Sequence, residues 1–207
     1  MPRITVVPAT PERWADMQVV FGGPWNIDHC WCQFVRLSSS DYAKSTFEQR
    51  TGLLESQTHQ DPVPGMVAYV DGEPCGWIGF GVRSRMERLV RSRTIPLVDD
   101  VPVWSVFCFL IRVGYRRQGV AQALLDGLVE YARQQGSPML EAYPVETNGK
   151  RIHGSGAYVG LATMFRRAGF SEILQTDARA EHLPRILMRL DLRETADSAA
   201  GEVPTSG

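Results

Sequence analysis

Residues 103–121 read VWSVFCFLIRVGYRRQGVA, and this stretch decides the fold. Its first nine residues are mostly apolar, with many β-branched and aromatic side chains, which predicts a buried central strand. A turn with a glycine at its exit, Gly119, comes next, and apolar residues then repeat at helical spacing to about Gln135. The stretch therefore predicts a strand, a tight turn and an amphipathic helix that packs on the sheet.

The turn has the chemistry of an anion-binding site. The first N–H groups of a helix have no partner within the helix, so they point out of the turn. Gly119 removes the side chain where a phosphate would approach the backbone, Ala121 keeps the next turn narrow, and Arg116 and Arg117 add positive charge. Many strand-to-helix turns contain glycine and surface arginines, so the turn alone is weak evidence.

The remaining sequence predicts further strands and helices on both sides of this stretch. Turn residues 71–74 join two short apolar runs, which predicts a β-hairpin. From the N-terminus we expect a strand at 4–7, a helix from Thr10, a helix at 40–59, hairpin strands at 65–70 and 75–82, and an irregular segment at 83–102. Beyond the central helix we expect a strand at 139–143, a loop at 144–156, a helix at 157–168 and strands at about 171–175 and 185–192. Residues 1–193 are expected to form one domain, and the polar tail 194–207 to be disordered.

This order of elements resembles the GNAT superfamily of acetyl-CoA-dependent N-acetyltransferases. The family's cofactor motif is usually written Gln/Arg-x-x-Gly-x-Gly/Ala, and Arg116, Gly119 and Ala121 match it. The resemblance spans most of residues 1–192 and is strongest over 103–170. It implies a mixed α/β fold with a central, mostly antiparallel sheet that is splayed at the cofactor strand and has helices on both faces.

The resemblance also implies acetyl-CoA as the cosubstrate. Backbone groups at the end of the cofactor strand would pair with the pantetheine arm, and the amides of the turn would hold the pyrophosphate. Tyr158 stands where family members often have an asparagine that helps to hold the cofactor. The implied cofactor-binding residues are Ile111, Val113, Arg116, Arg117, Gln118, Gly119, Val120, Ala121 and Tyr158.

The sequence departs from the family at both usual catalytic positions. The tyrosine that commonly protonates the departing thiolate is replaced by Phe165, and the strand glutamate that serves some members as a base is replaced by Ser105. Glu141 and Tyr143 share one face of the next strand, because side chains alternate along a strand. Tyr143 is therefore a candidate donor and Glu141 a candidate base, with Tyr158 as a third donor candidate. The alternative for Glu141 and Tyr143 is an ordinary strand position with a satisfied polar group.

Two further segments have side chains that could bind a ligand. The segment Asp28-His29-Cys30-Trp31-Cys32 has metal-ligand chemistry, but one Cys-x-Cys pair matches no tetrahedral site, so we predict no metal and free thiols. The aromatic residues in and around this segment, Trp25, Trp31 and Phe34, fit a wall of the acceptor pocket or a packed loop. The arginines at 83, 85, 88, 91 and 93 could face the 3′-phosphate of CoA, an acidic acceptor or nucleic acid, or form a solvated loop.

Composition narrows the classes of partner. The formal net charge is −1, which argues against nucleic acid, and no window reaches the ~18 apolar residues of a membrane span, so we expect a cytoplasmic protein. The expected function is transfer of an acetyl group from acetyl-CoA to an amine of a small molecule or peptide. The alternative is an acyl-CoA-binding or interaction module without turnover. The sequence leaves open whether the protein is a homodimer.

Overall fold

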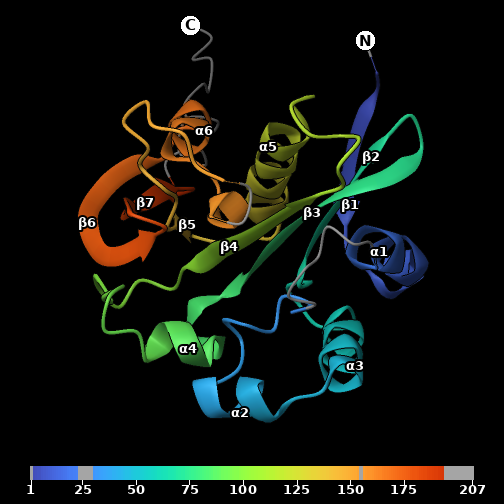
Figure 1. Cartoon of the computed structure of the whole chain (residues 1–207), viewed down its shortest axis with the longest axis horizontal. Helices are drawn as coiled ribbons and strands as arrows, with labels where there is room; N and C mark the ends of the chain where they lie inside the picture. Colours follow the sequence, from blue (N-terminus) through green and yellow to red (C-terminus); the bar gives the residue numbers. More distant parts are fainter. Residues whose placement is uncertain (1, 23–29, 154–155, 194–207) are drawn as a thin grey trace, which may run out of the picture.

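A computed structural model describes residues 2–22, 30–153 and 156–193 (Figure 1). One sheet has the strand order β1-β2-β3-β4-β5-β7-β6. Only the β4–β5 pair in this sheet is parallel, so the predicted mostly antiparallel sheet is confirmed. The strands are β1 (Ile4–Pro8), β2 (Gly65–Val70), β3 (Glu73–Val82), β4 (Trp104–Ile111), β5 (Met139–Ala142), β6 (Ser171–Ala180) and β7 (Leu183–Asp191).

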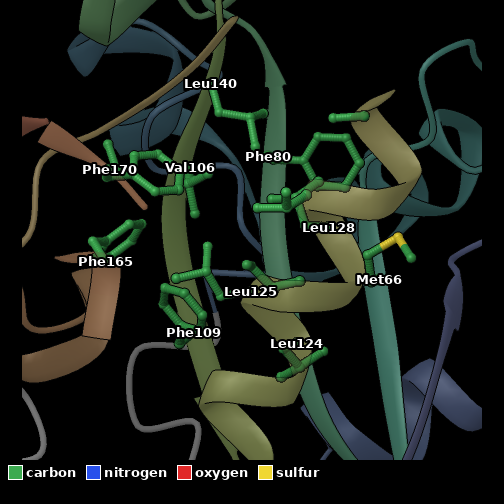
Figure 2. Close-up of a cluster of buried hydrophobic side chains, with 14 of the residues drawn as sticks. Met66, Phe80, Val106, Phe109, Leu124, Leu125, Leu128, Leu140, Phe165 and Phe170 are labelled. Atoms are coloured by element: carbon green, nitrogen blue, oxygen red, sulfur yellow. The ribbon is translucent and has the colours of Figure 1, made fainter. Parts of the chain in front are cut away.

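The predicted central helix is α5 (Val120–Gln134), and it packs on β1, β2, β3 and β4. Figure 2 shows its leucines at 124, 125 and 128 directed at side chains of the sheet. All three are fully buried, and complete burial of a leucine stabilises a fold by about 1.5–3 kcal/mol. Glycines with positive φ stand on either side of the helix, Gly119 at +86° just before it and Gly136 at +68° after its C-cap residue, a conformation that glycine adopts without strain.

The opposite face of the sheet carries a second core. Three helices contribute to it, namely α1 (Trp14–Phe21), α3 (Phe47–Gln57) and α4 (Glu87–Val90). Their buried residues Phe21, Leu54 and Leu89 belong to one cluster with Trp77 of β3 and Leu187 of β7. Helices therefore cover both faces, as predicted, and Figure 1 shows α5 and α6 at one end of the view and α3 and α4 at the other.

Two predicted helices are each divided in the structure. The helix predicted at 40–59 is α2 (Ser39–Lys44) followed by α3, because Ser45 and Thr46 are extended and Thr46 starts α3 with a capping box to Gln49. The helix predicted at 157–168 is a 3₁₀ turn, η3 (Ala157–Val159), followed by α6 (Ala162–Arg167). Gly160 has φ +81° between them, which a continuous helix does not allow.

Other segments differ in length or regularity. The last two strands, β6 and β7, are longer than predicted because they pair with each other over most of their length. The segment predicted to be irregular contains η2 (Arg83–Arg85) and α4, and η1 (Pro11–Arg13) leads into α1. The predicted disorder of 194–207 lies outside the described residues. No helix in the described ranges has the length and apolar content that a membrane span requires.

Candidate functional site

The sheet opens between β4 and β5. These strands pair only from Trp104 to Val106, and a register shift against β3 leaves Phe107 as the extra residue of a bulge. After Ala142 the chain leaves β4, and Val145 instead forms bridges to Leu161 and Arg185. A bulge bends a strand, so the part of β4 beyond Val106 is splayed and has no strand partner on its β5 side among the described residues.

The turn after β4 leads into the N-terminus of α5. Arg116 Nε donates to the carbonyl oxygen of Ile111 at 3.1 Å, and Gln118 Nε2 donates to that of Gly114 at 2.8 Å. The first bond of the helix runs from the Ala123 N–H to the Gly119 carbonyl, so the amides just before Ala123 have no acceptor within the helix. These amides and the positive end of the helix dipole favour an anion here.

The turn also has room for a phosphate. A Cβ added at Gly119 would meet only Ile4 Cδ1, at 3.9 Å, so the space beside this backbone is open. The predicted cofactor residues from Arg116 to Ala121 lie together in this turn, and Ile111 and Val113 lie at the adjoining end of β4. Tyr158 belongs to η3, a later segment of the chain that packs against β4. The unpaired edge of β4 and the open turn fit the pantetheine arm and pyrophosphate of CoA.

A pocket of about 710 Å³ adjoins the split on the side of the second core. Its wall includes Phe107 of β4, Tyr143 after β5, and Tyr158 of η3. The rest of the wall comes from loop residues near Phe34, from the segment 88–95, from Asp177 to Arg179 of β6 and from Arg185 of β7. The pocket therefore joins residues from four regions that are far apart in the sequence.

A buried ion network lies beneath this pocket and is centred on Glu141. Glu141 is fully buried, and its two carboxylate oxygens are 3.1 Å from Arg83 Nε and 2.7 Å from Arg189 Nε. Arg189 Nη1 also contacts Asp99 Oδ2 at 2.6 Å. Arg83 Nη2 donates to the carbonyl oxygens of Ile95 and Pro96, both at 3.2 Å. The network therefore ties the sheet to the loop that forms one pocket wall.

Tyr143 belongs to the same network. Its phenol donates to Glu141, accepts from Arg83 Nε at 3.1 Å, and lies 3.0 Å from Ser105 Oγ. Burial, and then the negative charge of Glu141, raise the pKa of Tyr143 above its ordinary value. The phenol proton is thus already engaged, and both oxygens of Glu141 are paired. This geometry favours a structural role for Glu141 and Tyr143 over the acid and base roles expected from the sequence.

Two other candidate positions have clear surroundings. Phe165, at the position of the family's tyrosine, is fully buried and lies edge-on to Phe109 and Phe170 with ring centres 6.0 and 5.1 Å away. It can only pack, as the sequence indicates. Tyr158 is 39% exposed and lines the pocket, and its phenol interacts with the guanidinium of Arg185. Tyr158 is therefore the tyrosine of this group that a ligand in the pocket can reach.

The arginine-rich segment 83–93 is not one solvated loop. Arg83 is buried in the ion network, and Arg85 donates to the carbonyl oxygen of Asp61 at 3.2 Å. The Arg88 guanidinium lies 4.1 Å from the centre of the Phe34 ring, whereas Arg91 forms an exposed pair with Glu87. Only part of the segment therefore faces solvent, because Arg83 lies in the interior whereas Arg88 and Arg91 lie in the pocket wall.

The aromatic segment near residue 30 is described from Cys30 onward, and the expectations for Trp25, Asp28 and His29 lie outside the described residues. Trp31 is buried and stacks on Phe21 with ring centres 4.9 Å apart, so it packs in the second core. Phe34 is in the pocket wall. No disulfide bond joins the four cysteines, and the described residues contain no group of three or more His, Cys, Asp or Glu placed to hold a metal ion.

The sequence analysis missed the arginines of β7. Arg185 and Arg189 are four positions apart in β7, so they lie on the same face of the strand as Leu187. Arg189 enters the buried network, and Arg185 Nε donates to the carbonyl oxygen of Tyr143 at 2.8 Å. Two arginines inside an otherwise apolar run were the available signal, because charged residues are rarely buried without a partner.

The sheet splits beside the N-terminus of α5, which is the arrangement that the resemblance to the GNAT family implies. The chain belongs to the acetyltransferase (GNAT) family, whose model matches residues 28–153, more than half of its length. Comparison with curated proteins finds no match.

Solved structures show the same fold at low identity. One is described as a histone acetyltransferase HPA2 and related acetyltransferase from Corynebacterium glutamicum, at 18% identity and TM-score 0.54, with all of both chains covered. Another is yncA from Salmonella typhimurium with its cofactor acetyl-CoA, at 16% identity and TM-score 0.54, covering 91% of this chain and 94% of that one. A third, a GNAT-family acetyltransferase from Streptococcus pneumoniae, has 16% identity and TM-score 0.53, covering 91% and 99%.

Proposed function

We propose that this chain transfers the acetyl group of acetyl-CoA to an amine of a small molecule or peptide. The observation that carries the proposal is the split between β4 and β5, because the part of β4 without a β5 partner runs from Phe107 in the pocket wall to the turn before α5. A donor bound along β4 would place its thioester where an amine in the pocket can attack it. Membership of the GNAT family supports acetyl transfer. That the acceptor is an amine is the part of the proposal that goes beyond family membership.

The turn and the splayed strand supply the groups that would hold the donor. Amides from Gly119 to Ala121 would bind the pyrophosphate, with Arg116 and Arg117 exposed beside them. The free edge of β4 near Ile111 and Val113 would pair with the pantetheine arm in the manner of an added strand. Acetyl-CoA supplies an activated thioester when bound.

The reaction needs two proton movements. The amine nitrogen forms a bond to the acetyl carbon, the carbon–sulfur bond breaks, the amine loses a proton, and the thiolate gains one. We assign the proton donor to Tyr158, because its phenol is accessible from the pocket whereas that of Tyr143 is buried and engaged. Water accepts the proton of the amine. Glu141 and Tyr143 are positioning residues that hold the pocket wall through Arg83.

A panel of amines incubated with acetyl-CoA tests the proposal, with CoA release and acetylated product both measured. In Tyr158→Phe, kcat should fall by roughly 10²-fold while the KM for acetyl-CoA stays nearly constant, because proton donation matters chiefly in the transition state. Phe165→Leu is the control and should change kcat modestly through packing. An unchanged kcat in Tyr158→Phe would remove Tyr158 as the donor.

A module that binds acyl-CoA without turnover is the second candidate. It is favoured by one observation: the positions of the family's usual acid and base hold Phe165 and Ser105, both fully buried. Binding of acetyl-CoA, shown by a rise in melting temperature, with no product from any amine would support the module and contradict the transferase.

The remaining expectations belong to the same proposal. We propose that residues 1–193 form a single domain and that the protein is cytoplasmic.

A further inference from the structure

The pocket wall contains a cation with no anionic partner. The Arg185 side chain is partly buried, and its Nε donates to the carbonyl oxygen of Tyr143 at 2.8 Å. Among the described residues, no carboxylate lies within 4.0 Å of its guanidinium. This contrasts with Arg83 and Arg189 of the neighbouring network, which both contact Glu141.

The other charged residues of the wall leave this positive charge uncompensated. Arg88 donates to the Phe34 carbonyl oxygen at 2.5 Å, and Arg179 donates to that of His182 at 3.1 Å. Arg91 is the wall arginine with an acidic partner, the exposed Glu87. Asp177 is the one acidic residue that the described pocket wall contains. The wall therefore holds four arginines against a single carboxylate.

A guanidinium in this setting favours an anion. Removing a cation from water without a counter-charge is costly, and burial lowers the pKa of Arg185 below its ordinary value. A carboxylate or phosphate can accept two parallel N–H bonds from a guanidinium, and such charge-assisted bonds are about twice as strong as neutral ones. A neutral ligand offers no comparable compensation.

We propose that the acceptor is a small amine that also carries a carboxylate or phosphate group, and that Arg185 binds this anionic group in the pocket. The proposal rests on the amine acetylation proposed above. Asp177, which is exposed on the neighbouring strand β6 and lines the same pocket, attracts the positively charged amine before it loses its proton. A molecule with both groups therefore matches the charges of the pocket, whereas a simple alkyl amine matches only one.

Matched amines test this inference in the wild-type protein. β-Alanine against propylamine varies a carboxylate, and phosphoethanolamine against ethanolamine varies a phosphate, so the two arms distinguish the anionic groups. In at least one pair, kcat/KM for the anionic member should exceed that of its neutral partner tenfold or more, the range expected for charged hydrogen bonds. Equal values within both pairs would overturn the inference.

Variants of Arg185 then assign the selectivity to this side chain. Arg185→Met should reduce the preference for the anionic amine to about unity and leave the KM for acetyl-CoA nearly unchanged. Arg185→Lys should keep part of the preference. Arg133→Met removes an exposed positive charge on α5 and serves as the matched control, with the preference intact. A preference that survives in Arg185→Met, or equal losses for both amines, would contradict the assignment.

A binding measurement separates failure of this inference from failure of the proposed function. Calorimetric titration of the same amines into the protein with CoA present needs no turnover. Tighter binding of the anionic member without acetylation would support the pocket inference and contradict the transferase. Acetylation of both members at equal rates would support the transferase and contradict the pocket inference.

Discussion

Glu141 has the chemistry of a catalytic base, but its surroundings favour a structural role. Glu141 lies on the face of β5 that is directed toward the second core, as Tyr143 does. Its two oxygens contact Arg83, which lies 58 positions earlier in the sequence, and Arg189, which lies 48 positions later. Such a carboxylate stabilises the fold only while its partners are present. Removal of one member of a buried ion pair leaves an uncompensated charge, which is more costly than the pair itself is favourable.

We therefore predict that Glu141→Gln destabilises the protein by about 3–5 kcal/mol, because two buried guanidinium groups would face a neutral amide. Urea unfolding curves would measure the loss. Glu87→Gln is the control, because Glu87 pairs with Arg91 at 3.4 Å on the surface, where such a pair contributes below about 1 kcal/mol. Equal losses in the two variants would show that the network does not stabilise the fold.

At the scale of elements, local backbone chemistry decides where helices begin and end. Thr46 and Gln49 restart a helix that the polar pattern alone would continue, and Gly160 separates η3 from α6. For α5 the two ends have different consequences. Its last turn ends at the solvent-exposed surface. Its first turn instead has unpaired amides beside the splayed edge of β4.

Gly119→Glu should abolish the increase in melting temperature caused by CoA, because its side chain would add bulk and negative charge where the pyrophosphate binds. The matched control is Gly136→Glu at the other end of α5. Both glycines have positive φ, so the two variants share the backbone strain, and nothing lies within 4 Å of a Cβ at Gly136.

Gly136→Glu should melt at a lower temperature than the wild type and still respond to CoA. A response to CoA that persists in folded Gly119→Glu would contradict the assignment of the phosphate site.

At the scale of the molecule, one sheet supports a core on each face. The α5 side contains Trp104, which stacks on Phe80, and the other side contains Trp77, which lies edge-on to Phe21. Every strand contributes hydrogen bonds to the same sheet. Loss of the core on one face would therefore expose that face of the sheet, on which the other core also depends. This coupling supports the proposal of a single domain.

Unfolding should therefore be a single transition. When Trp25 and Trp104 are both replaced by phenylalanine, fluorescence comes from Trp14, Trp31 and Trp77 on the α1 side, while far-ultraviolet circular dichroism reports the whole fold. The two signals should give the same urea midpoint. Separate midpoints would mean that the two cores unfold independently.

The sequence by itself determined the central architecture. The apolar run 103–111, the turn at Gly119 and the helical repeat that follows predicted β4, α5 and the anion-binding turn, because hydrophobic period and glycine geometry act within a few residues. The resemblance to the GNAT family added the split sheet. The divided helices depended on capping and on one positive φ, which a hydrophobic pattern does not report.

Only the tertiary structure decided the roles of the polar residues. The sequence left both a catalytic role and a satisfied strand position open for Glu141 and Tyr143. In the structure Arg83 contacts both side chains, and Arg189 contacts Glu141, from distant segments. Arg185 became a pocket residue because β7 lies next to β5, and no local pattern specifies that neighbour. The sequence specifies the chemistry of each side chain. The fold decides which strands and loops come together, and therefore which charges have a partner and which are left unpaired.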